Sequence, residues 1–127
     1  MLKLIIGVKG TGKTKALIEM INAALDSTKG SVVCIEKGTN LQLTLNYNCR
    51  LINSDEYMIS SASELYGFIA GLLASNHDIT DLFVDATFRI CKRDLAAFEQ
   101  FVLEADALTA KLGVNLVMTV SMPAENA

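Results

Sequence analysis

The sequence predicts an α/β protein, a three-layer α/β/α sandwich around a largely parallel sheet. Short apolar runs with strand character alternate along the chain with longer stretches whose apolar residues recur at helical spacing. Such alternation favours parallel strands joined by helices that cover both faces of the sheet. Apolar residues make up 51% of the chain, which suits a sheet buried on both faces.

The length of 127 residues fits one domain. We expect a single domain over residues 1–122, because no linker, repeat or low-complexity stretch interrupts the alternation. The sole proline, Pro123, opens a short polar segment, and residues 123–127 are expected to form a flexible tail.

Five short apolar runs bounded by turn residues are predicted as strands. They cover residues 2–6, 31–35, 49–53, 79–85 and 114–120. A further segment, residues 41–47, alternates leucine and tyrosine with polar residues, which favours a strand. Leu41 and Leu45 would also share one face of a helix, so both interpretations of this segment stay open.

Three helices are predicted, and each has a recognisable end. The first should run over residues 13–26, until the polar stretch before Gly30 ends it. Ser61 and Glu64 have the spacing of a capping box at the start of the second. Asp94 can cap the third, which Gly113 should end. The expected inner face of the third helix consists of Leu95, Phe98, Phe101, Val102, Ala105 and Leu108.

The first predicted strand leads into a glycine-rich segment that matches the phosphate-binding pattern G-x-x-x-x-G-K-[ST]. The segment reads Gly7, Val8, Lys9, Gly10, Thr11, Gly12, Lys13 and Thr14, and we include the following Lys15 among the nucleotide-binding residues. A strand before the loop and a helix after it are the setting this motif requires. The alternative is a glycine-rich turn that binds nothing.

Each residue type in this loop suits a bound phosphate. Glycines let the backbone turn sharply and bring its N–H groups close to an anion. The helix that begins near Lys13 directs the positive end of its dipole to the same place. Lys13 can contact the terminal phosphates, and the Thr14 hydroxyl can bind Mg²⁺.

Asp85 is the predicted second ligand of the magnesium site, because it follows an apolar strand. We expect Thr14 and Asp85 to meet at adjacent strand ends. An aspartate that only caps a turn before Ala86 is the alternative, and Asp81 is a rival at the wrong end of the strand.

Ligands of such sheets bind beyond the carboxyl ends of the strands. The loop after the first strand, Glu36, Asp85 and Ser121 should therefore share one edge. Hydrolysis needs a group that positions or activates water, and Ala86 stands where many P-loop ATPases have a glutamate. Glu36 is the candidate catalytic residue, since its strand should neighbour that of Asp85. A solvated loop glutamate paired with Lys37 is the alternative.

With these residues the chain resembles the RecA-like (ASCE) division of P-loop NTPases. The resemblance implies that Glu36 supplies the catalytic carboxylate and that Ser121 senses the γ-phosphate. The layout is also similar to thymidine-kinase-like proteins, but their acidic residue after the aspartate and their zinc-binding lasso have no counterpart here. A RecA-like core usually has a further strand beside the P-loop strand, for which this length leaves no room.

The predicted function is binding of a nucleoside triphosphate with Mg²⁺, ATP in preference to GTP, with slow hydrolysis. The alternatives are a non-hydrolysing, nucleotide-dependent interaction module, a small nucleoside or small-molecule kinase, and a loop that holds only phosphate or sulfate. A protein partner or a homo-oligomer is compatible with the sequence. Its arginines, Arg50, Arg89 and Arg93, are either surface residues or arginine fingers for a neighbouring subunit.

Charge and cysteine content limit the other classes. A net charge of −3 with no basic face argues against nucleic-acid binding by bulk charge. Cys34, Cys49 and Cys91 lack metal-like spacing, and Cys34 is expected in the core. The apolar stretch 65–74 is too short to span a bilayer, and no signal peptide is visible. These features predict a cytoplasmic protein without a membrane partner.

Overall fold

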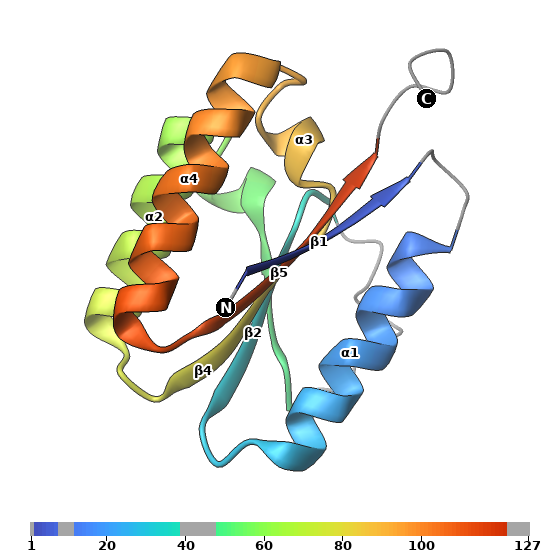
Figure 1. Cartoon of the computed structure of the whole chain (residues 1–127), viewed down its shortest axis with the longest axis vertical. Coiled ribbons are helices and arrows are strands. Elements are labelled where there is room, and N and C mark those ends of the chain that lie inside the picture. The colour runs from blue at the N-terminus through green and yellow to red at the C-terminus, as the bar shows by residue number, and fades with distance from the viewer. Residues whose placement is uncertain (1, 8–11, 39–47, 122–127) are drawn as a thin grey trace.

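A computed structural model describes residues 2–7, 12–38 and 48–121 (Figure 1). Its described strands form one five-stranded sheet in the order β1-β5-β4-β2-β3, and every neighbouring pair is parallel. The bounds are β1 (Leu2–Gly7), β2 (Ser31–Glu36), β3 (Arg50–Asn53), β4 (Ile79–Val84) and β5 (Asn115–Ser121). The predicted parallel sheet is confirmed, and segment 41–47 lies outside the described residues.

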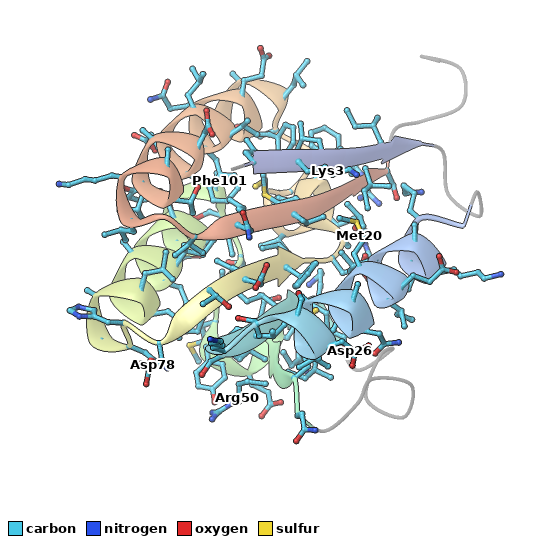
Figure 2. The ribbon with its side chains drawn as sticks, turned by 60° about the horizontal axis from the view of Figure 1, so that its bottom comes forward. Lys3, Met20, Asp26, Arg50, Asp78 and Phe101 are labelled. Carbon is cyan, nitrogen blue, oxygen red and sulfur yellow. The ribbon has the colours of Figure 1, made fainter. Side chains whose placement is uncertain are left out.

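Helices cover both faces of this sheet, which confirms the three-layer α/β/α prediction. The longer helices are α1 (Lys13–Ser27), α2 (Ala62–Ser75) and α4 (Leu95–Leu112). Helix α1 lies on one face, and α2 and α4 lie side by side on the other (Figures 1 and 2). In Figure 2, Met20 of α1 and Phe101 of α4 mark the two sides. A short helix, α3 (Thr87–Ile90), and a 3₁₀ turn, η1 (Ser54–Tyr57), were not predicted.

Side-chain alternation along the strands divides the interior into two apolar cores. In β2, Val33 and Ile35 join the core beneath α2 and α4, whereas Val32 and Cys34 join the core beneath α1. Successive side chains of a strand point to opposite faces, so residue numbers within each strand specify the face. This parity decides which polar residues at the strand ends share a side with α1.

The predicted helix ends are confirmed, with one detail changed. The Ser61 hydroxyl accepts the Glu64 N–H at 3.2 Å, and Asp94 accepts the Ala97 N–H at 3.1 Å. Gly113 ends α4 with a left-handed φ of 72°. The Glu64 carboxylate, however, accepts the N–H of Ser60 at 2.9 Å, one residue before the position a capping box uses. This backbone bond and the Ser60 hydroxyl lower the pKa of Glu64.

The prediction of the inner face of α4 is wrong at one residue, Leu95. Leu95 is 53% exposed, because it is the first residue of the helix and the buried face begins one turn later at Phe98. Thr109, which was not predicted there, is fully buried on that face. Its hydroxyl donates to the Ala105 carbonyl at 2.8 Å, so the buried polar group is satisfied within the helix.

Strand β1 forms one edge of the sheet among the described strands, since it pairs only with β5. Ile6 on this strand is 58% exposed. Within residues 2–7, 12–38 and 48–121, the structure describes no strand on the other side of β1. Over the same residues, no helix has both the length and the apolar character needed to cross a membrane.

Candidate functional site

The start of α1 has the backbone form expected for a phosphate-binding loop. Gly12 precedes the helix in the left-handed region with φ 85°, and its carbonyl accepts the Ala16 N–H at 3.1 Å. A Cβ at Gly12 would meet no atom within 4 Å, so backbone conformation alone favours glycine here. Lys13, Thr14 and Lys15 form the first helical turn, while Val8 to Thr11 lie outside the described residues.

Among the described residues no side chain caps α1, and the first turn of this helix contains no acidic residue. The first N–H groups of a helix have no partner within the helix and attract anions. In Figure 1 this helix start lies at the same end of the sheet as the arrowheads of β1 and β5. The positive end of the helix dipole is therefore located at the carboxyl edge of the sheet, as predicted.

Three polar side chains lie at this edge on the face that α1 covers. Each of them comes two residues after an apolar side chain of the core beneath α1. Side chains two residues apart in a strand point to the same face of the sheet. These polar residues are Glu36 after Cys34, Asp85 after Phe83, and Thr119 after Val117. Alternation thus places a glutamate, an aspartate and a hydroxyl beside one another on the α1 face.

Glu36 ends β2 and is only 1% exposed. Its strand pairs with β4, which confirms the predicted neighbour of the Asp85 strand. The alternative of a solvated glutamate paired with Lys37 is wrong, because Glu36 is buried and Lys37 forms its ion pair with Asp55 at 2.7 Å. Lys37, the residue after Glu36, extends toward η1, where Asp55 lies, and so does not pair with Glu36.

Asp85 is held from both neighbouring strands. Its backbone N–H donates to the Ile35 carbonyl at 2.8 Å, which continues the pairing of β4 with β2. Its Oδ1 accepts the Thr119 hydroxyl of β5 at 2.5 Å. The same hydroxyl accepts the Ala86 N–H at 2.8 Å. Within the described part of the chain, Thr119 is the only group that donates to this carboxylate.

Thr119 was missed by the sequence analysis. It is 2% exposed and lies in a strand that is otherwise almost entirely apolar between residues 116 and 120. A buried hydroxyl needs hydrogen-bond partners, so a polar residue near the carboxyl end of an apolar strand is a signal that could have identified it.

The expectation that Thr14 and Asp85 meet at adjacent strand ends is wrong. Strand β5 lies between β1 and β4, and Met118 pairs with Leu4 on one side and Val84 on the other. Helix α1 instead packs across β1, β5, β4 and β2, so the helix brings Thr14 to this edge. Ser121 ends β5 beside Gly7, its partner in the register.

Glu36 and Asp85 form a pair of neighbouring carboxylates. They directly follow Ile35 and Val84, which are paired in adjacent strands, and adjacent strands lie about 4.8 Å apart. Burial raises the pKa of the Cys34 thiol well above its usual range, and the nearby Cys49, Asp85 and Glu36 add to this shift. Two acidic groups on one face favour a cation close by, since opposite charge offsets their mutual repulsion.

Asp81, the alternative magnesium ligand, forms hydrogen bonds near the amino end of β4. Its carboxylate accepts the Thr80 hydroxyl at 2.8 Å and the Asn115 amide at 3.2 Å, near the amino end of β4. Asp81 pairs with Asn115, the first residue of β5, and therefore lies in the amino half of β4, away from Asp85.

The remaining candidates are exposed arginines and buried cysteines. Arg50 is exposed at the start of β3, and Arg89 and Arg93 are exposed in and after α3. The cysteines are Cys34, Cys49 and Cys91; all are described, buried and free of disulfide bonds, which confirms Cys34 as a core residue. Over residues 2–7, 12–38 and 48–121, no three of the His, Cys, Asp and Glu side chains gather into a metal-binding group.

Comparison of this chain with protein-family models and with curated proteins found no match. The class of the site is therefore defined by its own residues and their arrangement.

Proposed function

We propose that this chain is a compact P-loop nucleotide-binding protein of the RecA-like kind. It binds a nucleoside triphosphate with Mg²⁺ across Gly7 to Thr14, prefers ATP to GTP, and hydrolyses it slowly. The observation that carries this proposal is the arrangement of Glu36, Asp85 and Thr119. All three are on the α1 face, at the edge where that helix begins.

The donors at this edge fit the phosphate groups of a nucleotide. The first turn of α1 directs its backbone N–H groups toward this edge, and Gly12 directly before it adopts a left-handed conformation. Lys13 adds a positive charge in the same turn. The positive charges of Lys13 and Lys15 in this first turn oppose the helix dipole, and a bound anion would offset that repulsion.

The oxygen groups at the edge also fit Mg²⁺. This ion commonly takes one or two protein ligands and completes its shell with water and phosphate oxygens. The Thr14 hydroxyl, exposed in the first turn of α1, and the Asp85 carboxylate supply such a set. When bound, Mg²⁺ neutralises charge on the phosphates and on the carboxylates around it.

Glu36 is suited to hold a water molecule for attack on the terminal phosphate. Its carboxylate is buried at the end of β2, next to the strand of Asp85. A buried carboxylate acts in surroundings of low dielectric constant, where its hydrogen bond to water is strong. Ser121, beside Gly7 at the end of β5, is placed on the strand between the P-loop and Asp85 and is proposed to contact the γ-phosphate.

Binding without turnover is the second candidate, and Ala86 is the observation that favours it. An alanine side chain has no carboxylate, so the position after Asp85 offers none to a water molecule, and its backbone N–H donates to Thr119. In this case the chain would be an interaction module whose partner responds to the bound nucleotide. Turnover measured beside nucleotide binding separates the two candidates.

Isothermal titration with ATP, GTP and their diphosphates, with and without Mg²⁺, tests the proposal. Lys13→Ala removes a charge-assisted contact and should weaken triphosphate binding by about 1.5–3 kcal/mol, or roughly 10–150-fold. Lys29→Ala is the matched control, because it removes an exposed lysine beyond the other end of α1. Equal affinity of the parent and a folded Lys13→Ala variant would refute binding at this loop.

A further inference from the structure

Thr119 links the carboxylate of Asp85 to the turn that follows it. Its hydroxyl lies 2.5 Å from Asp85 Oδ1 and 2.8 Å from the Ala86 nitrogen. Thr119 and Asp85 are 34 residues apart in the chain and meet only because β5 pairs with β4. Thr119 is 2% exposed and lies on the sheet face that α1 covers.

The direction of both hydrogen bonds follows from the groups involved. A backbone N–H can only donate, so the Thr119 oxygen accepts from Ala86. A threonine hydroxyl has one hydrogen, and that hydrogen is then free to donate to Asp85 Oδ1. The hydroxyl therefore fixes Oδ1 of the carboxylate. Within the described ranges, Oδ2 accepts no hydrogen bond.

Asp85 is consequently restrained at both its backbone and its side chain. The Ile35 carbonyl holds the backbone from β2, and Thr119 holds the carboxylate from β5. Threonine is suited to this task because branching at Cβ limits its χ1 rotation. The turn at Ala86 adopts a left-handed conformation that is unfavourable in a residue other than glycine, and the bond to Thr119 helps to stabilise it.

We propose that Thr119 is the positioning residue of the magnesium site, acting through Asp85 and not on the nucleotide. This inference rests on the proposed function. A valine would fill the same space in the strand, so the two hydrogen bonds are what the hydroxyl adds. Groups that orient a metal-binding side chain typically contribute about 10–100-fold to metal affinity.

Titration of Mg²⁺ against a fixed concentration of ATP and protein tests this role. Thr119→Val should raise the Mg²⁺ concentration at half-saturation by about 10–100-fold. Metal-free ATP affinity should stay within about twofold, because the phosphates contact other groups. Thr119→Ser keeps the hydroxyl and should stay close to the parent. If Thr119→Val does not fold by circular dichroism, Thr119→Ala takes its place, since it introduces no mismatched group.

A double-mutant cycle with Asp85→Asn identifies the residue through which Thr119 acts. Asp85→Asn alone should weaken the Mg²⁺ dependence and leave metal-free binding nearly unchanged. If Thr119 acts through Asp85, its substitution should have almost no further effect on Mg²⁺ dependence in the Asp85→Asn background. A purely structural role for Thr119 predicts the same loss in both backgrounds and equal losses with and without metal.

The outcomes distinguish this inference from the function on which it rests. A parent protein whose ATP affinity does not depend on Mg²⁺ overturns both, and that result comes from the parent alone. A parent with Mg²⁺-dependent binding that Thr119→Val retains overturns only the role of Thr119. Three results together support the role of Thr119. Thr119→Val loses the Mg²⁺ dependence, Thr119→Ser keeps it, and Thr119→Val has no further effect on it in the Asp85→Asn background.

Discussion

Gly30 joins α1 to β2, and replacing it with alanine tests how closely two backbone segments approach at the amino edge of the sheet. A Cβ at this position would lie 2.2 Å from the Asp78 carbonyl oxygen and 2.5 Å from Thr80 Cγ2. Real Cβ atoms do not approach a backbone oxygen so closely, so the Asp78 segment must move. The backbone of Gly30 is outside the left-handed region, and the effect is therefore steric.

The hydrogen bonds around Gly30 set the size of the effect. The Asp78 carbonyl accepts the Ser31 N–H at 2.7 Å, and the Thr28 hydroxyl accepts the Gly30 N–H at 3.0 Å. The Thr28 hydroxyl also bonds the Thr80 hydroxyl. Displacement of these groups weakens two or three bonds of about 0.5–1.5 kcal/mol each. Gly30→Ala should therefore lower the free energy of unfolding by about 1–4.5 kcal/mol, or Tm by on the order of 10 °C.

Chemical denaturation followed by circular dichroism measures this change. Gly67→Ala is the matched control, because Gly67 is exposed in α2 and a Cβ there meets no atom within 4 Å. This control should gain about 0.5–1 kcal/mol of stability from the better helix propensity of alanine. Nucleotide affinity should not change in the folded Gly30→Ala variant, since the site lies at the opposite edge. A Gly30→Ala variant as stable as the parent would refute the inferred close approach.

Two further predictions concern turnover and pH. Glu36→Gln keeps the shape of the side chain and should lower hydrolysis by about 10²–10⁴-fold while triphosphate binding survives; unchanged turnover would exclude Glu36 as the water-positioning group. Burial raises the pKa of Cys49 and of Cys91 to about 11, so the folded state binds these protons more tightly than the unfolded chain. The free energy of unfolding should therefore fall as pH rises from about 8.5 to 11. Cys49→Ala and Cys91→Ala should each reduce that slope in urea titrations, and identical slopes in all three proteins would contradict it.

The sequence by itself determined the three longer helices and the five described strands, because their signals are local. Short apolar runs predicted all five described strands to within one residue of their observed ends. The caps at Ser61 and Asp94 and the stop at Gly113 follow from hydrogen bonds and backbone angles that involve only neighbouring residues. The glycine needed before α1 is likewise a local requirement, and Gly12 meets it.

Only the tertiary structure decided which polar groups meet. The order of strands is a non-local property, and the insertion of β5 between β1 and β4 overturned the adjacency expected for Thr14 and Asp85. The burial of Glu36 depends on the strands beside β2 and on α1 above it, so a local pattern could not separate it from a solvated glutamate. Thr119 and Asp85 lie on strands far apart in the chain, and strand pairing alone makes their hydrogen bond possible.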